Sequence, residues 1–440
     1  MSEFSQELQI AAALNPVEAL ACFQKNIPHQ WIEEALQQTG RAAVRRRRFP
    51  AEQAVWLVLG IGLMRNRSIA DVCDKLDLAF PDAKGALPPL ASSSVTDARA
   101  KLGYEPLRYL FHTTAAHWEQ EDNEHALCGL KIFSVDGTQF RVPDTAENQS
   151  FGFASGQASY PSVMAVALMS AKSHLIADVA FGAVDAGEIC YAQQLVGSVP
   201  ANSLTLFDRA YFSAELLLSW EQAGEERHWL TPVKSKLRYE VIERFSDYDC
   251  LIEMPVSPQA QVQAPYLPKT WRARMVRIAQ PNGDIKGFIT SMQDPVRYPL
   301  PQVLKVYWDR WEIEQGYGEL KRGQLDDSEL LRSQKKDGVY QELWGILIAY
   351  NLVRLEMLRM AVEYKVHPLR ISFINALRLI QDEFLWCSGR TPGTVPKKLR
   401  NLRLSGKRLI LPEKRNRPSY PREVLAKPSK YPTKKKAARC

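Results

Sequence analysis

One stretch of the chain, YWDRWEIEQGYGELK from Tyr307 to Lys321, places a carboxylate among groups that can bind phosphate. If the stretch is a helix with about 100° between successive residues, then Tyr307, Arg310, Glu314 and Lys321 fall within a strip roughly 60° wide. Arg suits bidentate contacts with phosphate, Lys suits a point-charge contact, and the phenol could donate a hydrogen bond. The spacing is also that of a surface ion pair between Arg310 and Glu314, and both roles can hold together.

The same predicted helix has a side that should face a core. Three apolar residues spaced seven apart lie beside the strip: Val306, Ile313 and Leu320. Three further acids fall on the opposite side and are expected to face water: Asp309, Glu312 and Glu319. Glu314 would therefore lie at the margin of the buried side, in line with two cations and a phenol.

Two further carboxylates lie on predicted strands. The segment from Leu130 to Val142, LKIFSVDGTQFRV, is rich in β-branched and aromatic residues and is predicted to be a central strand that contains Asp136. An aspartate inside a buried strand is unfavourable unless it is paired or binds a metal. Asp208 follows the short apolar segment from Ser203 to Phe207, and active sites of α/β sheets usually lie at such strand ends.

Together these motifs resemble one family of enzymes. The motifs VDGT at 135–138 and DRAY at 208–211, with the spacing Y-x2-R-x3-E-x6-K from Tyr307, resemble the signature of the insertion sequence 4 family of DDE transposases. Three further segments look like family positions: RRRRFP near Arg45, HWLTP near Trp229 and QELWGILIAYNLVR at 341–354. The resemblance covers most of the chain, from about Asn15 to the C-terminal tail.

The resemblance implies a DNA transposase with a ribonuclease H-like catalytic domain. Asp136, Asp208 and Glu314 would be its three catalytic, metal-binding carboxylates, with Asp136 bridging two Mg²⁺ ions that Mn²⁺ can replace. Two such ions, about 4 Å apart, neutralise charge on the entering and the leaving oxygen of a phosphodiester reaction, and hard oxygen ligands hold them. Three residues of the signature stretch would contact the DNA strand beside the metals: Tyr307, Arg310 and Lys321.

Residues 1 to about 120 are predicted to be helical. Apolar residues recur at steps of three and four over 16–20, 32–38, 50–64 and 69–76. A short helix after residue 91, together with the helix before it, could form a helix-turn-helix, although most helix pairs of this size simply pack on each other. The family resemblance favours DNA contact, and the candidates are Arg45, Arg46, Arg47, Arg48, Arg99 and Lys101.

The middle of the chain predicts an α/β fold. Strands at 163–168 and 175–181 follow the strand of Asp136, then a helix at 189–199, the strand before Asp208 and a helix at 213–223. The pattern alone predicts an α/β protein with an antiparallel hairpin, and the resemblance implies a ribonuclease H-like mixed sheet with helices. Strands then alternate from 228 to 292, a β-rich insertion similar to the family's. Some relatives carry a Trp near its end that traps a flipped base; here Phe288 is the candidate, or the trap is absent.

The expected organisation has three parts. Residues 1–122 would form an all-helical N-terminal DNA-binding domain, and residues 123–390 the catalytic domain, with the β-rich insertion at about 225–298. Residues 391–440 would be a basic tail, extended or disordered, because sixteen Lys and Arg side chains stand against two Glu from Lys397 onward, within a total net charge of +8. Such a tail indicates a polyanionic partner, most often nucleic acid, or serves only to keep the chain soluble.

Composition excludes several classes of protein. The seven cysteines are each more than fifty residues apart, which excludes a zinc knuckle and gives no disulfide framework. The N-terminus lacks the basic segment of a signal peptide, and the most apolar run, 54–64, is too short to span a bilayer. We therefore expect a cytoplasmic, nucleoid-associated protein with no membrane partner.

The predicted function is transposition. The chain would bind the terminal inverted repeats of an insertion sequence, cut it out and join it to target DNA by two-metal hydrolysis and strand transfer. Relatives cut both strands through a hairpin, so cut-and-paste movement through hairpin ends is expected, and joining two ends implies a homodimer on DNA. Two alternatives stay open: a ribonuclease H-like nuclease without strand transfer, and an inactive DNA-binding regulator derived from a transposase. The intact set of acids disfavours the regulator.

Overall fold

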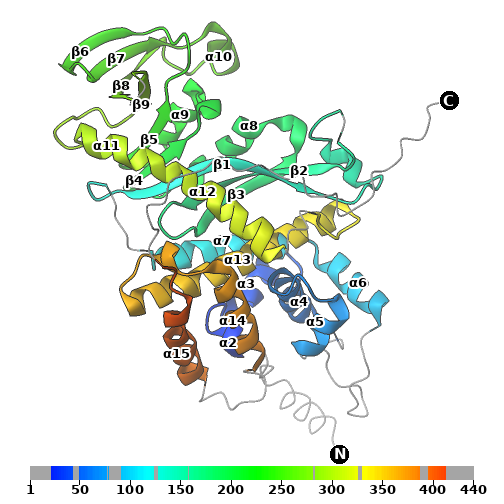
Figure 1. The fold of residues 1–440 in the computed structure, drawn as a ribbon. Coiled ribbons are helices and arrows are strands. Elements are labelled where there is room, and N and C mark those ends of the chain that lie inside the picture. The colour runs from blue at the N-terminus through cyan, green and yellow to red at the C-terminus, as the bar shows by residue number, and fades with distance from the viewer. Residues whose placement is uncertain are drawn as a thin grey trace, which may run out of the picture.

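The structure, a computed structural model, describes residues 21–42, 49–76, 78, 91–122, 127–156, 158–280, 283–325, 330–386 and 395–412. A nine-stranded sheet runs through its centre with helices on both faces (Figure 1). The strands in spatial order are β3 (Ile176–Ala183), β2 (Ser162–Ser170), β1 (Lys131–Arg141), β4 (Ser203–Phe207), β5 (Arg227–Pro232), β9 (Ile285–Thr290), β8 (Thr270–Ala279), β7 (Asp249–Pro255) and β6 (Glu240–Ser246).

The first five strands combine two kinds of pairing. β1, β2 and β3 are successive antiparallel strands, whereas β4 runs parallel to β1 and β5 runs parallel to β4. Parallel neighbours need a crossover connection, and the helices α8 (Glu188–Gln194) and α9 (Ala214–Gln222) supply it. The predicted mixed sheet with helices is confirmed.

The inserted strands extend this sheet instead of forming a separate layer. β5 pairs in parallel with β4 on one side and antiparallel with β9 on the other. β5 therefore belongs to the central sheet, and the insertion begins after Pro232, not at about 225. It consists of β6 to β9 with the short helix α10 (Pro258–Gln263) between β7 and β8.

Helices pack on both faces of the sheet (Figure 1). α8 and α9 cover one face, and the other face carries the N-terminal helices together with α13, with which they share an apolar core. The N-terminal helices are α2 (Ala21–Gln24), α3 (His29–Gln38), α4 (Ala51–Leu63), α5 (Ile69–Lys75), α6 (Ser92–Leu102) and α7 (Glu105–Glu119), and α13 spans Lys336–Tyr364. A further helix, α14 (Phe373–Trp386), packs into the same core. The helix expected at 16–20 lies outside the described residues. Of the described residues, no helix is both long and apolar enough to cross a membrane.

The expectation that residues 391–440 are extended or disordered is wrong for the first part of this segment. α15 (Val395–Ser405) packs on the helical core through three buried residues: Val395, Leu399 and Leu402. Arg403 Nε lies 3.1 Å from Oε2 of Glu356, a buried acid of α13. The apolar spacing of four and three residues was hidden because Lys and Arg stand between these positions. Residues 413–440 lie outside the described part of the chain.

Candidate active site

The central sheet brings two of the predicted acids together. Val135 pairs with Phe207 in parallel register, so the residues that follow them, Asp136 and Asp208, lie at the same level on neighbouring strands. Asp208 directly follows β4, and the carboxyl end of such a strand is the usual place for an active site in an α/β sheet. The fold therefore places both aspartates at one point of the sheet.

Asp136 is a half-buried acid with Arg310 as a nearby cation. Its Oδ1 accepts a hydrogen bond from the Gly137 N–H at 2.8 Å, and its Oδ2 lies 3.8 Å from Nη1 of Arg310. Burial raises the pKa of Asp136 to about 6, although the Gly137 N–H and the Arg310 guanidinium act to lower it. The carboxylates of Glu188 and Glu314 add to the increase. An acid in this setting would gain from a nearby divalent cation.

Asp208 begins the turn that follows β4. Its side chain accepts a hydrogen bond from the Arg209 N–H, and its carbonyl accepts one from the Thr231 hydroxyl of β5 at 3.3 Å. The turn buries Tyr211, whose O–H donates to Oε2 of Glu188 at 2.9 Å. Sequence reasoning missed Glu188. The available signal was Tyr211 itself, because a buried tyrosine usually needs an acceptor for its hydroxyl.

The signature stretch is not one regular helix. A 3-10 turn at Tyr307–Arg310 continues α11 (Leu300–Val306), α12 covers Trp311–Gly318, and a π-helix spans Glu319–Gln324. The predicted core-facing side is confirmed by three buried residues: Val306, Ile313 and Leu320. Because 3-10 and π turns do not advance by 100° per residue, a straight strip does not describe the two ends of the stretch.

Arg310 lies between two of the acids. Its Nη2 is 3.2 Å from Oε1 of Glu314 and its Nη1 is 3.8 Å from Oδ2 of Asp136, and 8% of its side chain is exposed. Burial acts to lower the pKa of Arg310, but Tyr307 and the carboxylates of Asp208, Asp136 and Glu314 raise it overall. The ion pair expected between Arg310 and Glu314 is present. Arg310 Nε is buried and has no hydrogen-bond partner among the described residues.

The donor chemistry of this site fits Mg²⁺. Within the described ranges, no three His, Cys, Asp or Glu side chains are gathered closely enough to hold a metal ion, and Arg310 supplies the positive charge between Asp136 and Glu314. The candidate ligands are carboxylate oxygens, which Mg²⁺ prefers. Burial is the main cause of the raised pKa of Asp136, and neither the Gly137 N–H nor Arg310 offsets it.

Comparison with known proteins decides the family. A model named "Transposase DDE domain" matches residues 128–352, which contain all three acids, and "Insertion element 4 transposase N-terminal" matches residues 17–112. The transposase InsG for insertion sequence element IS4 of Escherichia coli (strain K12) is 36% identical over 424 residues, which cover 95% of this chain and 94% of InsG. This chain belongs to the insertion sequence 4 family of DDE transposases. It is therefore an enzyme that acts on DNA, and its catalytic domain is ribonuclease H-like, as predicted.

A solved transposase structure is also similar. The cryo-EM structure of the piggyBac transposase synaptic complex with hairpin DNA aligns with 92% of this chain and 87% of that chain, at 13% identity and a TM-score of 0.43.

The remaining signature residues of this transposase lie against aromatic rings. Tyr307 is buried, and its ring centre is 4.4 Å from that of Phe288. Burial raises the pKa of Tyr307 to about 12, so the phenol keeps its proton at neutral pH. Phe288 is 1% exposed and belongs to the core, so it is not free to trap a flipped base. Lys321 Nζ lies 5.6 Å from the ring centre of Phe140. DNA contact by Tyr307 and Lys321 stays a prediction.

Acids on the other side of the signature stretch do not simply face water. Lys172 Nζ lies 2.8 Å from Asp309, and the two ring nitrogens of His174 lie 3.2 Å from Glu312 and 3.1 Å from Glu319. The expectation is wrong because Lys172 and His174, in the connection between β2 and β3, pack against this side. The stretch that carries Glu314 is thus held through three acids outside the predicted catalytic set.

The N-terminal candidates for DNA contact differ in their surroundings. Arg99 on α6 donates from Nε to Oε1 of Gln341 on α13 at 2.9 Å, and burial lowers the pKa of Arg99. This contact favours the helix-packing interpretation for Arg99, whereas Lys101 is exposed. Arg45, Arg46, Arg47 and Arg48 lie outside the described residues.

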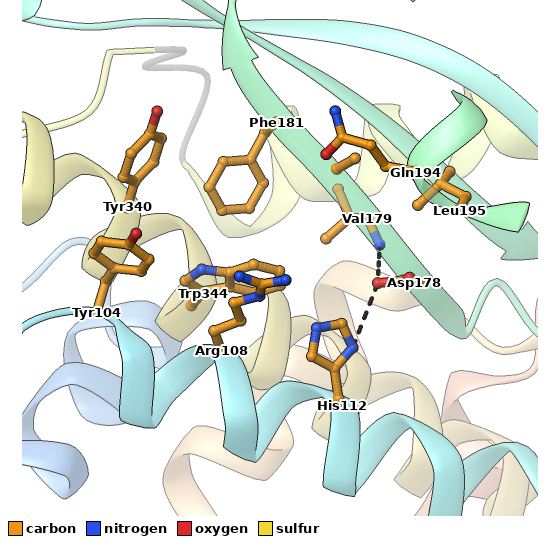
Figure 2. A pocket seen from close by; sticks show the side chains of 11 residues that line it. Tyr104, Arg108, His112, Asp178, Val179, Phe181, Gln194, Leu195, Tyr340 and Trp344 are labelled. Carbon is orange, nitrogen blue, oxygen red and sulfur yellow. Dashed lines mark hydrogen bonds and ion pairs between the residues drawn. The ribbon is translucent and has the colours of Figure 1, made fainter. Parts of the chain in front are cut away.

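A separate hollow of about 230 Å³ contains none of the predicted catalytic acids (Figure 2). It lies between α7, β3 and α13, and its polar and aromatic lining includes Tyr104, Arg108, His112, Phe181, Tyr340 and Trp344. Its buried acid, Asp178, is already engaged by three neighbours: His112 Nδ1 at 3.5 Å, the Val179 N–H at 2.7 Å and the Ser198 hydroxyl. The predicted catalytic acids Asp136 and Asp208 belong to the central strand β1 and to the turn after β4, outside this hollow.

Proposed function

We propose that this transposase binds the terminal inverted repeats of its element, cuts the DNA there and joins the element to target DNA, using Asp136, Asp208 and Glu314. The observation that carries the proposal is the parallel register that sets Asp136 beside Asp208, with Arg310 linking Asp136 to Glu314. Carboxylates supplied by separate elements are the kind of ligand set that two-metal phosphodiester chemistry requires, and binding of the ions would draw the three together.

Two Mg²⁺ ions, or Mn²⁺ in their place, would be held by these three carboxylates and would neutralise the charge on the entering and leaving oxygens. The side chains around them orient the DNA. Arg310 and Lys321 add positive charge for the phosphates, and Tyr307 keeps its proton and can donate it to a phosphate oxygen.

One active site can serve both strands of a DNA end. The oxygen of a water attacks the phosphorus at the end of the element, the bond from phosphorus to the 3′-oxygen breaks, and a 3′-hydroxyl and a 5′-phosphate result. The new 3′-hydroxyl then attacks a phosphorus of the opposite strand, which closes a hairpin and releases the 3′-oxygen of the flanking strand. A second water opens the hairpin. Each step exchanges one phosphorus–oxygen bond for another, so we propose cut-and-paste movement by this route.

The proposed partners follow from the reaction. Two element ends must be joined, and each end needs its own set of acids, so we propose a homodimer on DNA. The excess of Lys and Arg beyond residue 396 supports a contact with the phosphate backbone. An enzyme of this kind would work on DNA in the nucleoid.

The test uses the purified protein and an end-labelled duplex that carries the terminal inverted repeat, with and without Mg²⁺. Asp136→Asn and Glu314→Gln are expected to keep DNA binding and to slow cleavage by about 100-fold or more, because each removes a metal ligand. Glu363→Gln, which changes an exposed acid at the end of α13, is the matched control and should cleave normally. Cleavage near the wild-type rate by either acid variant would contradict the site.

Denaturing electrophoresis of the same reactions separates the alternatives. A hairpin runs as a strand of about twice the original length before it is opened. Double-strand breaks without this species, when hairpin opening is slowed, would favour a nuclease without strand transfer. DNA binding without Mg²⁺-dependent cleavage by the unmodified chain would favour a regulator.

A further inference from the structure

His174 has a backbone conformation that normally favours glycine. It lies in the connection between β2 and β3 with a φ of +60°, and it is 2% exposed. A residue with a Cβ is strained in this region, where glycine is the usual occupant and asparagine the commonest substitute. A buried histidine at such a position therefore needs side-chain contacts that offset the strain.

Those contacts are made with the stretch that carries Glu314. His174 Nε2 lies 3.2 Å from Oε2 of Glu312, and Nδ1 lies 3.1 Å from Oε2 of Glu319. Glu312 lies before Glu314 on α12, and Glu319 follows it as the first residue of the π-helix. One imidazole ring thus contacts the stretch on both sides of Glu314, across the point where the α-helix becomes a π-helix.

Hydrogen bonds to both carboxylates require an N–H on each ring nitrogen. A neutral imidazole has one N–H, so the lone pair of its second nitrogen would face a carboxylate, whereas an imidazolium donates from both nitrogens. Arg354, which is fully buried, lies 3.4 Å from Glu319 and supplies one positive charge. An imidazolium at His174 supplies a second, so the charges of Glu312 and Glu319 are balanced.

The connection that carries His174 is fixed by other parts of the chain. The hydroxyls of Ser170 and Ser173 donate to Oδ2 of Asp122 at 2.8 and 2.5 Å. Arg354 Nε, on α13, donates to the Ser173 carbonyl at 2.7 Å. Because these anchors do not belong to the signature stretch, the ring of His174 can determine where that stretch lies.

We propose that His174 is a positioning residue of the active site, an imidazolium that holds the stretch through Glu312 and Glu319 and thereby sets the place of Glu314. It acts through these two acids and not on the DNA itself. The strained backbone of the connection is kept because it directs the ring between the two carboxylates. The proposal rests on the proposed function of Glu314.

The deciding variant is His174→Asn. Asparagine tolerates a positive φ, so the change removes the second donor and the charge without adding backbone strain. The full chain is assayed with the end-labelled inverted-repeat duplex, below the melting temperature of the variant. We expect the cleavage rate at saturating DNA and Mg²⁺ to fall about tenfold or more, because a small misplacement of a reacting group is costly. The dissociation constant for the duplex should not change.

Nuclear magnetic resonance tests the imidazolium directly. The chain is labelled with ¹⁵N-histidine, and the signals of His174 are assigned by their absence from His174→Asn. At the pH of the cleavage assay, both ring nitrogens of His174 should carry a hydrogen. A ring with one bare nitrogen would overturn the proposal, because it could hold only one of the two acids.

Lys365→Asn is the matched control, since Lys365 also has a positive φ but is exposed at the end of α13, and cleavage should be normal. If His174→Asn cleaves at the wild-type rate, the proposal is wrong. Should His174→Asn fail to fold, Glu312→Ala decides in its place. Glu312 is 33% exposed, and its loss removes one of the two contacts while Glu319 keeps Arg354. A normal cleavage rate for Glu312→Ala would then refute the role of His174.

The same assay separates this inference from the proposed function. Glu314→Gln is run alongside. If Glu314→Gln still cleaves with Mg²⁺, the assignment of the site itself fails. If Glu314→Gln is inactive and His174→Asn behaves like the wild type, only the role of His174 is refuted.

Discussion

Asp136 lowers the stability of the metal-free protein at neutral pH. Burial raises its pKa to about 6, and 22% of its side chain is exposed. An unfolded aspartate titrates near 3.9, so between about pH 4 and 6 the folded state binds a proton that the unfolded state has lost. Stability therefore falls as the pH rises through this window, and it stays lower above pH 6. A bound cation would remove the penalty, which couples folding of the site to metal binding.

Replacing Asp136 by Asn should reverse this effect. In EDTA at pH 8, we expect Asp136→Asn to be more stable than the wild type by about 1 to 3 kcal/mol, because the variant has no buried carboxyl group to ionise. At pH 4 the two proteins should be equally stable, since the wild-type acid is protonated in the folded state. Urea denaturation at both pH values measures the difference. If the difference in unfolding free energy between variant and wild type does not change with pH, the ionised carboxylate of Asp136 does not destabilise the folded protein.

The catalytic helix is held at the residue where it changes from an α-helix to a π-helix. Glu319 Oε2 accepts a hydrogen bond from the Tyr350 hydroxyl at 3.0 Å, and Arg354 Nη1 lies 3.4 Å from the same carboxylate. Arg354 is fully buried and also donates from Nε to the Ser173 carbonyl at 2.7 Å. α12 is thereby tied to α13 and to the connection between β2 and β3. Because Glu314 lies on the same helix, these contacts set its distance from the sheet.

Glu319→Gln should be strongly destabilising, although the sequence predicted that Glu319 faces water. The change leaves Arg354 buried without its charged partner, and we expect a loss of about 3 kcal/mol at pH 7. Burial acts to raise the pKa of Glu319, but Arg354 and His174 hold it below its usual value. Its stabilisation is therefore present at neutral pH and is lost as the pH falls through that lowered pKa.

Thermal unfolding at pH 7 and at low pH checks this, and the gap between wild type and variant should narrow in acid. Glu312→Gln is the control on the same helix. Its side chain is 33% exposed and it meets His174, so it should lose less than about 1 kcal/mol. Equal losses for Glu312→Gln and Glu319→Gln would show that the contact with Arg354 contributes little.

The sequence correctly predicted elements that are recognisable from the residues within them. The strand before Asp208 was expected at Ser203–Phe207 and is found there, because a short run of apolar and β-branched residues is bounded by polar ones. Glu319 was misplaced because its partner Arg354 lies 35 residues later, and no periodicity reports on a contact between two helices. Glu188 was missed for the same reason, since its neighbours Gly137 and Tyr211 lie in β1 and in the turn after β4.

Across the whole molecule, the N-terminal helices are joined to the catalytic sheet by a close crossing of α4 and α13. A Cβ on Gly62 would lie 2.5 Å from the carbonyl oxygen of Gly345, so the two backbones touch. Gln324, in the π-helix, donates from Nε2 to the carbonyls of Gly62 and Ile346, each at 2.9 Å. The helical region expected to bind DNA is thus in direct contact with the last turn of the catalytic helix.

Gly62→Ala tests whether this crossing joins the two regions into one cooperative unit. The added methyl group meets backbone atoms, which cannot rotate away, so α4 and α13 must separate, and we expect a loss of about 1 to 3 kcal/mol. The control is Gly197→Ala, where a Cβ has no neighbour within 4 Å and the change should be neutral or stabilise by up to about 1 kcal/mol. Denaturation followed by both circular dichroism and tryptophan fluorescence should give a single transition at a lower midpoint. Two separate transitions would show instead that the N-terminal helices unfold on their own and that the crossing does not couple them to the catalytic sheet.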